Sequence, residues 1–175
     1  MARANELPTQ DLLAGAAALD EDIPRVLRLM EASSLEGLGW SRPSKLSLLV
    51  PMSGSYQGNE DRYLLRLGFQ AYRKWPPSAQ FVNPGTKGYV YPDDQRFVPK
   101  LTSSECYTHV AYRQTQQAPP VQLICCSATL EFYEVLHHVK PEHLWKETDT
   151  FLTTIMAIRK ALSSFYGGRF SADGH

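Results

Sequence analysis

The sequence has no excess of charge of either sign and no long apolar run. Its 18 Lys and Arg residues balance 18 Asp and Glu residues, so the basic excess expected of a nucleic-acid-binding protein is missing. No stretch approaches the roughly 18 apolar residues needed to span a bilayer. The N-terminal residues are polar and acidic, unlike a secretory signal peptide. We therefore expect neither nucleic acid nor a membrane as partner.

Cysteine is also scarce, with only Cys106, Cys125 and Cys126 among 175 residues. An odd count argues against the disulfide framework of a secreted protein, so we expect free thiols in a reducing, cytoplasmic compartment. The chain contains no C-x-x-C pair, no G-x-S-x-G elbow, no phosphate-binding glycine loop and no dinucleotide fingerprint. The sequence thus predicts neither a metal site nor an organic cofactor.

The length suits a single domain, residues 1–175, which can bury a core without disulfides or metals. We divide it into an N-terminal helical part (1–44), a sheet and active-site region (45–126) and a C-terminal helical part (127–175). Helices followed by strands and then helices predict an α+β fold, with the helices segregated from an antiparallel sheet.

Apolar spacing and turn residues predict the individual elements. Helices are expected at 8–36, 128–138 and 151–165, and strands at 45–51, 62–72, 79–82, 88–91, 107–112 and 121–126. Pro24 should kink the first helix or start a second one. The polar stretch 52–61 reads as a turn, and Gly167 and Gly168 should stop the last helix. The five prolines between 83 and 120 make that region the least regular.

Cys125 and Cys126 end an apolar run, V-Q-L-I-C-C. Adjacent side chains on an extended segment point to opposite sides, so the pair is ill suited to bind one metal ion. One thiol is expected to pack as a small hydrophobe in the core, and the other can react if it is exposed. His137 and His138 suggest a Cys–His site, with solvated helix residues as the alternative reading.

Four short motifs follow one another in a defined order. W-P-P-S-A-Q-F (75–81) follows a strand-like segment. Tyr-Pro-Asp (91–93) comes after an aromatic residue, and L-I-C-C-S-A (123–128) places a cysteine beside apolar residues. Trp145 precedes Thr150, the first residue of the last helical pattern, by five positions.

This ordered set resembles the ubiquitin-conjugating (E2) enzyme family over residues 10–165. The resemblance implies an E2/UBC-like fold with an N-terminal helix, an antiparallel β-meander, an irregular active-site region and C-terminal helices. Two departures stand out: residues 94–120 look inserted, and the family's His-Pro-Asn tripeptide is replaced by 91–93. Such divergence is similar to that of bacterial E2-like proteins encoded beside E1-like, ubiquitin-like and deubiquitinase-like partners in antiphage defence operons.

The resemblance also implies roles for single residues. Cys125 would carry the thioester, with Cys126 in the neighbouring apolar slot and as the alternative nucleophile. Asp93 stands where the family has an asparagine that supports the oxyanion, although an ionised carboxylate only accepts hydrogen bonds. His109 is a candidate substitute, as a proton acceptor or an oxyanion donor. Structural support of the site would come from Pro76, Pro77, Phe81 and Trp145.

The implied activity is thioester exchange and transfer. An E1-like activating enzyme would supply a ubiquitin-like modifier, and a nucleophile on a target protein would receive it. No cofactor of its own is implied, because ATP is consumed at the E1 step. Two alternatives remain open: a catalytically inactive E2-variant binding module in the same pathway, and an unrelated cysteine hydrolase that uses Cys125 with His109.

Overall fold

The computed structural model describes residues 7–135 and 144–171, and its first element is helix α1 (Leu12–Leu29). The Asp11 side chain caps the helix by accepting a hydrogen bond from the N–H of Ala14 at 3.0 Å. The helix expected over 8–36 is thus confirmed in its central part. It continues through Pro24, where a kink or a second helix was expected. Pro24 is exposed, so water can satisfy the carbonyl that loses its intrahelical partner.

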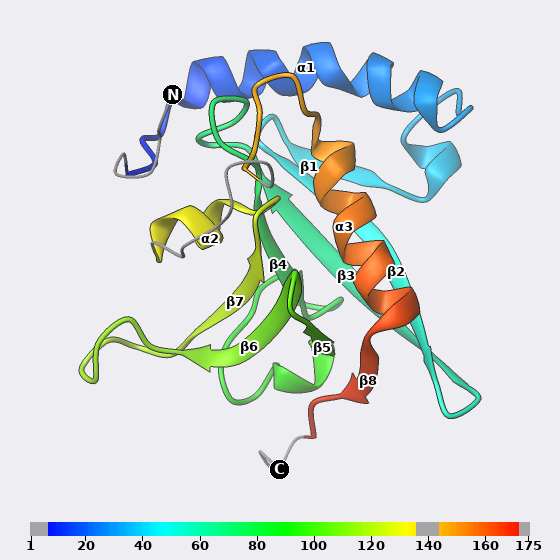
Figure 1. Ribbon diagram of the computed structural model, residues 1–175. Helices are drawn as coiled ribbons and strands as arrows, with labels where there is room; N and C mark the ends of the chain where they lie inside the picture. The colour runs from blue at the N-terminus through cyan, green and yellow to red at the C-terminus, as the bar shows by residue number, and fades with distance from the viewer. Residues whose placement is uncertain (1–6, 136–143, 172–175) are drawn as a thin grey trace.

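Gly15 allows α1 to lie directly on the chain that follows the first long hairpin. A Cβ atom at Gly15 would lie 1.9 Å from the carbonyl oxygen of Phe69, so only glycine fits this close approach. The N–H of Asp11 donates to the carbonyl oxygen of Gln70 at 2.7 Å beside it. In Figure 1, α1 crosses one end of the molecule, above the sheets.

The first sheet is an antiparallel meander in the order β1-β2-β3-β4. After a 3-10 turn, η1 (Glu36–Leu38), it contains β1 (Ser41–Ser44), β2 (Ser47–Tyr56), β3 (Asn59–Gly68) and β4 (Ser78–Val82). Tyr56 pairs with Asn59, so the turn between β2 and β3 is only Gln57–Gly58. Both turn residues have positive φ, 52° and 82°, as a two-residue hairpin requires. The long turn expected at 52–61 is therefore wrong, because the polar end of β2 keeps its strand pairing.

The second sheet is also antiparallel, in the order β7-β6-β5-β8. It contains β5 (Pro99–Ser103), β6 (Cys106–Tyr112), β7 (Val121–Cys126) and β8 (Tyr166–Arg169), with η2 (Gln95–Phe97) before β5. Residues 94–120, which look inserted in the sequence, thus supply two strands: β6, close to the strand expected at 107–112, and β5, which was not expected. No strand forms at 88–91. Gly167 and Gly168, expected to stop a helix, lie within β8 instead.

Two helices follow β7: the short α2 (Leu130–Glu134) and α3 (Phe151–Ser164). The expected apolar stripe of α3 is confirmed, because Phe151, Ile155, Ile158 and Leu162 are all buried. They pack into one cluster with residues of both sheets, such as Leu65 of β3 and Leu101 of β5. Figure 1 shows α3 lying along the first sheet, with the second sheet projecting to one side. The α+β class is confirmed.

Side chains of β7 and α2 cover the edge of β4 that does not pair with β3. The amide group of Gln122 accepts from the N–H of Phe81 at 2.6 Å and donates to its carbonyl oxygen at 2.8 Å. The Glu131 carboxylate accepts from the N–H of Ala79 at 3.1 Å. An unpaired strand edge is prone to pair with another chain, so these contacts both protect β4 and join it to β7 and α2.

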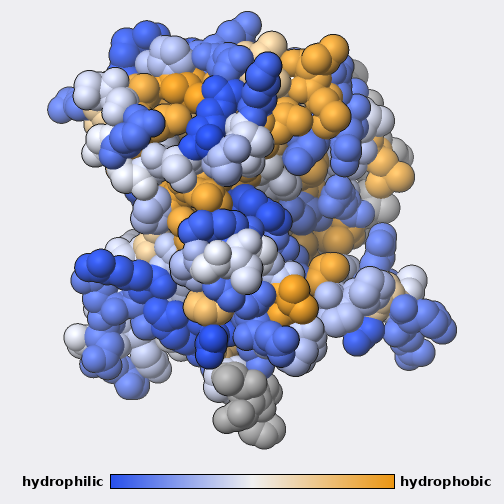
Figure 2. Space-filling view, turned by 180° about the vertical axis from the view of Figure 1, so that it is seen from behind, coloured by the Kyte–Doolittle hydropathy of each residue, from blue (hydrophilic) through white to orange (hydrophobic). Residues whose placement is uncertain are grey.

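The surface seen from behind in Figure 2 carries apolar side chains mainly in its upper half, among polar ones. Three of the large exposed apolar side chains belong to α1: Leu12, Leu13 and Leu29. Among the described residues, no helix is both long enough and apolar enough to cross a membrane.

Candidate functional site

Cys125 lies on β7 directly opposite Tyr107 of β6. Residues opposite each other in an antiparallel pair direct their side chains to the same face. Tyr107 is 44% exposed and Cys125 is half-buried, whereas Cys106, Cys126 and Ile124, on the alternate face, are buried. The two adjacent cysteines therefore point to opposite sides, as expected from an extended segment, and Cys125 is the one on the outer face.

His109 shares this outer face with Cys125. It lies opposite Leu123, which places it diagonally across from Cys125, a spacing of roughly 7–8 Å between backbone positions. The ring of Tyr107 lies 4.8 Å from that of His109, centroid to centroid, and the ring of Tyr112 lies 5.8 Å from it on the other side. The strand register thus brings the expected pair, Cys125 and His109, to one surface with an aromatic residue on each side of the imidazole.

Burial raises the pKa of the Cys125 thiol above its ordinary value of 9.0, and the neighbouring Cys126 adds to this shift. The neutral thiol is therefore the resting form at neutral pH. Because the thiolate is the nucleophile, Cys125 needs a proton acceptor or a positively charged partner molecule to react. The imidazole of His109, on the same face, is a side chain of the kind that can accept this proton.

Cys126 and Cys106 lie directly opposite each other on the buried face. Cys106 is 3% exposed, and so is Cys126. A hydrogen bond with Cys126 and burial raise the pKa of Cys106. The same hydrogen bond and the N–H of Ala128 lower the pKa of Cys126. A substrate as large as a protein tail has no access to either sulfur.

Asp93 is exposed in the turn after the cis Tyr91–Pro92 bond, and none of its described contacts is with Cys125. Its neighbour Asp94 is the buried carboxylate of this turn. Asp94 accepts hydrogen bonds from the side-chain amide of Asn83 and from the N–H of Val90, both at 2.8 Å. Asp94 therefore shapes the loop. Asp93 and Asp94 are adjacent in the sequence, and nothing in the sequence indicates which of the two is buried.

Pro77 and Trp145, two of the residues expected to support the site, hold the segment that follows Cys126. The N–H of Leu130 donates to the carbonyl oxygen of Pro77 at 3.1 Å. The Tyr133 hydroxyl donates to the carbonyl oxygen of Ser127 and accepts from the N–H of Trp145, each at 2.8 Å. Pro77 and Trp145 thus fix α2 from two sides, next to the strand that carries Cys125. His137 and His138 lie outside the described residues.

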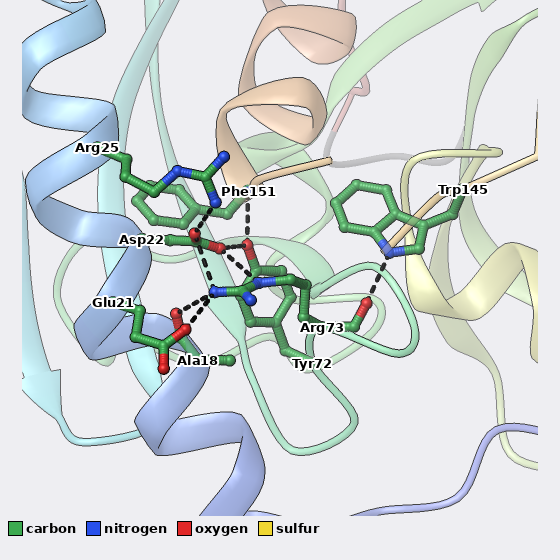
Figure 3. A network of polar contacts seen from close by, with 8 residues as sticks. All are labelled: Ala18, Glu21, Asp22, Arg25, Tyr72, Arg73, Trp145 and Phe151. Atoms are coloured by element: carbon green, nitrogen blue, oxygen red, sulfur yellow. Dashed lines mark hydrogen bonds and ion pairs between the residues drawn. The ribbon is translucent and has the colours of Figure 1, made fainter. Parts of the chain in front are cut away.

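A buried polar network connects Trp145 to α1 (Figure 3). No pattern in the sequence indicated this network. Asp22 is fully buried, and its carboxylate contacts the Tyr72 hydroxyl and the Arg73 guanidinium, whose Nε lies 3.1 Å away. The Tyr72 hydroxyl also accepts from the N–H of Phe151 at 2.9 Å, and the carbonyl oxygen of Arg73 accepts from the Trp145 indole at 2.9 Å. Asp22 thereby links α1, the loop after β3 and the start of α3.

A pocket of about 280 Å³ opens between β7, α2 and the β6–β7 hairpin. Its walls include Tyr112, Val121 and Leu123, together with the carboxylates Glu131 and Glu134. Burial raises the pKa of Glu131 to about 8, and the charge of Glu134 adds to that shift. Over 7–135 and 144–171, no three His, Cys, Asp or Glu side chains gather as metal ligands would.

Comparison of the chain with known proteins finds no match among protein-family models, curated proteins or solved structures. The function must therefore be inferred from the site and from the order of the motifs around it.

Proposed function

We propose that the chain is an E2-like conjugating enzyme that accepts a ubiquitin-like modifier as a thioester on Cys125 and passes it to a target nucleophile. The observation that carries the proposal is the position of Cys125. All three cysteines belong to the described residues, and Cys125 alone combines partial exposure with the motif position. The other two sulfurs face the core.

In the first step, Cys125 takes the modifier from an E1-like enzyme. Its thiolate attacks the carbonyl carbon of the E1 thioester, a new C–S bond forms, and the E1 thiolate leaves. Because the pKa of Cys125 is raised by burial, its proton must be removed as the complex forms. Both the attacking and the leaving group are thiols, so the exchange needs no cofactor on this chain.

In the second step, a target amine attacks the thioester on Cys125. The C–N bond forms, the C–S bond breaks, and the amine loses a proton. His109 is the side chain that we infer takes this proton, because it shares the outer face with Cys125 one diagonal position away. Asp93 is exposed in its turn, and a carboxylate cannot donate to an oxyanion, so we assign it no part in the chemistry.

The order of elements supports an E2-like fold, which we infer together with the activity. A helix precedes a four-stranded meander, the proline pair follows its third strand, and Trp145 precedes the helix α3. The strands β5 and β6 occupy the region that looked inserted in the sequence. This divergence favours a bacterial E2-like protein of an antiphage conjugation operon, with E1-like, ubiquitin-like and target proteins as partners in the cytoplasm.

Two other functions compete with this proposal. A catalytically inactive E2-variant binding module is favoured by the exposed Asp93 in place of the tripeptide asparagine and by the raised pKa of Cys125. A cysteine hydrolase would use the same Cys125 and His109. It would act on a substrate without an E1-like enzyme or ATP, whereas the binding module would form no covalent adduct.

The test mixes the chain with an E1-like enzyme and a ubiquitin-like modifier from the same operon, with and without ATP. We expect an ATP-dependent adduct that a thiol reductant removes, abolished in Cys125→Ala and retained in Cys126→Ala. No adduct with an E1-like enzyme shown to be active would favour the binding module. Turnover of the modifier without ATP would favour the hydrolase.

A further inference from the structure

The two cysteines that the proposed reaction leaves unused form a pair of their own. Cys106 of β6 and Cys126 of β7 are direct partners in the strand register, and both are 3% exposed. Partners in an antiparallel ladder have Cα atoms about 4.5 or 5.5 Å apart, depending on the kind of pair. Both values lie within the roughly 4.4–6.8 Å that a disulfide requires. A disulfide can thus form here without moving the strands apart.

The two thiols of this pair shift each other's pKa, raising that of Cys106 and lowering that of Cys126. The backbone of Ala128 also lowers the pKa of Cys126, and together these effects outweigh its burial. A thiolate at this sulfur is the form that reacts with oxidants. Cys106, whose pKa is raised, remains the neutral thiol beside it.

A small pocket leads from the surface to Cys106. It has a volume of about 140 Å³ and lies between the turn from β5 to β6 and helix α3. Glu105 and Lys160 line it, are about two-thirds exposed, and form an ion pair at 3.8 Å. A water molecule occupies about 30 Å³, so the pocket admits molecules of the size of hydrogen peroxide. Protein tails are far too large for it.

We propose that Cys106 and Cys126 form a redox-active dithiol that small peroxides convert into an intramolecular disulfide, while Cys125 stays a free thiol. One sulfur of the pair, as thiolate, attacks a peroxide oxygen; an S–O bond forms, the O–O bond breaks, and the leaving oxygen departs as water or alcohol. The second sulfur then attacks the sulfenic acid, loses its proton and displaces water. The two thiols are oxidised by two electrons and the peroxide is reduced by two.

The disulfide would join β6 to β7 directly beneath the face that carries Cys125. Cys125 cannot take the place of Cys106 in the pair, because its side chain points away from the core. Oxidation of the pair therefore leaves the outer thiol chemically intact. The proposal is independent of the conjugating activity, since it requires only the two buried sulfurs and the pocket.

The experiment treats the folded chain with one equivalent of hydrogen peroxide, alkylates it in denaturant and maps the peptides by mass spectrometry. We expect a linked Cys106–Cys126 peptide, with Cys125 alone alkylated, where the untreated chain has all three alkylated. The thermal unfolding midpoint should rise on oxidation and return with a thiol reductant. Consumption of Cys125 before the pair, or three free thiols after treatment, would overturn the proposal.

Two variants test the pair and its access route separately. Cys106→Ala should abolish the linked peptide. Ala157→Leu narrows the pocket from the helix side without touching a sulfur, so we expect oxidation of the pair to slow several-fold. Met156→Leu is the matched control, because Met156 is exposed on the same helix and its replacement should leave the rate unchanged. Equal rates in Ala157→Leu and the control would exclude the pocket as the route.

Discussion

At the scale of single residues, the strand register decides which cysteine meets solvent. Cys125 and Cys126 are neighbours in sequence, yet one faces Tyr107 on the outer surface and the other faces Cys106 in the core. A shift of the pairing by one residue would exchange these positions. The assignment of Cys125 as the reactive thiol therefore rests on the pairing of β6 with β7.

Thiol alkylation tests this assignment without any partner protein. In the folded chain we expect Cys125 to be alkylated well before Cys106 and Cys126, because it alone is half-exposed. Burial raises the pKa of Cys125 above 9.0, so its rate should still be increasing at pH 9. Peptide-resolved mass spectrometry gives both results. Preferential alkylation of Cys126, or a rate that levels off below pH 8, would contradict the assignment.

His109→Gln tests the inferred proton acceptor. We expect transfer from the Cys125 thioester to a lysine amine to slow by about a hundredfold, because a positioned general base contributes about that much. Formation of the thioester should persist. Single-turnover discharge of the preformed thioester to free lysine measures the step. Asp93→Asn is the control, and its rate should match that of the unmodified chain because Asp93 is exposed in its turn.

At the scale of elements, β7, which carries the thiol, and α2 both contact the first sheet. Gln122 and Glu131 cover the edge of β4 by bonding to Phe81 and Ala79. The strand with Cys125 is thus bound on one side to β6 and on the other to the first sheet. This arrangement holds the thiol on a strand, as the apolar run at 121–126 led us to expect.

Glu131 should make the stability of the fold depend on pH. Its pKa is raised from 4.5 to about 8, so between these values the folded chain binds a proton that the unfolded chain has released. The stabilisation is complete below about pH 4.5 and is lost as the pH rises through about 8. Urea unfolding at pH 5 and pH 8 measures the loss.

Glu131→Gln keeps an oxygen that can accept from the N–H of Ala79 but removes the titration. We expect its stability to fall less between pH 5 and pH 8 than that of the unmodified chain. Glu134→Gln, which changes an exposed side chain on the same helix, should have a smaller effect. The same pH dependence in Glu131→Gln and the unmodified chain would show that the carboxylate of Glu131 is not the group responsible.

At the scale of the whole molecule, the sequence predicted what local patterns determine and missed what distant pairing determines. Apolar residues at three- and four-residue spacing identified α1, and the apolar stripe from Phe151 to Leu162 identified α3. Strands β4, β6 and β7 were also found close to their true bounds. β8 was missed because two glycines read as a helix stop, and it forms only by pairing with β5, far away in the chain.

The candidate site around Cys125, like the fold, could be predicted in part. That adjacent cysteines face opposite sides follows from strand geometry, and the structure confirms it. The placement of His109 required the register of β6 with β7, which no local pattern provides. Asp22 was missed because its partners Tyr72 and Arg73 lie about fifty residues further along the chain, so no spacing rule connects them.

Asp22→Ala should weaken the whole fold, because Asp22 links α1 to the loop after β3 and to α3. The change leaves the Arg73 guanidinium and the Tyr72 hydroxyl without their buried partner. Removing one member of a buried ion pair costs about 3–5 kcal/mol. Chemical denaturation measures the difference. The matched control is Glu21→Ala, because Glu21 pairs with the same arginine but is 68% exposed and should cost less than about 1 kcal/mol.

Mapping the covalent bond itself shows whether Cys125 carries the modifier. After the reaction with an E1-like enzyme, modifier and ATP, non-reducing digestion and mass spectrometry identify the modified peptide. We expect the modifier's C-terminal residue on Cys125, and a reductant-resistant oxyester when Cys125→Ser replaces the sulfur. The modifier on Cys126 or Cys106, or an adduct unchanged in Cys125→Ser and still removed by a reductant, would contradict it.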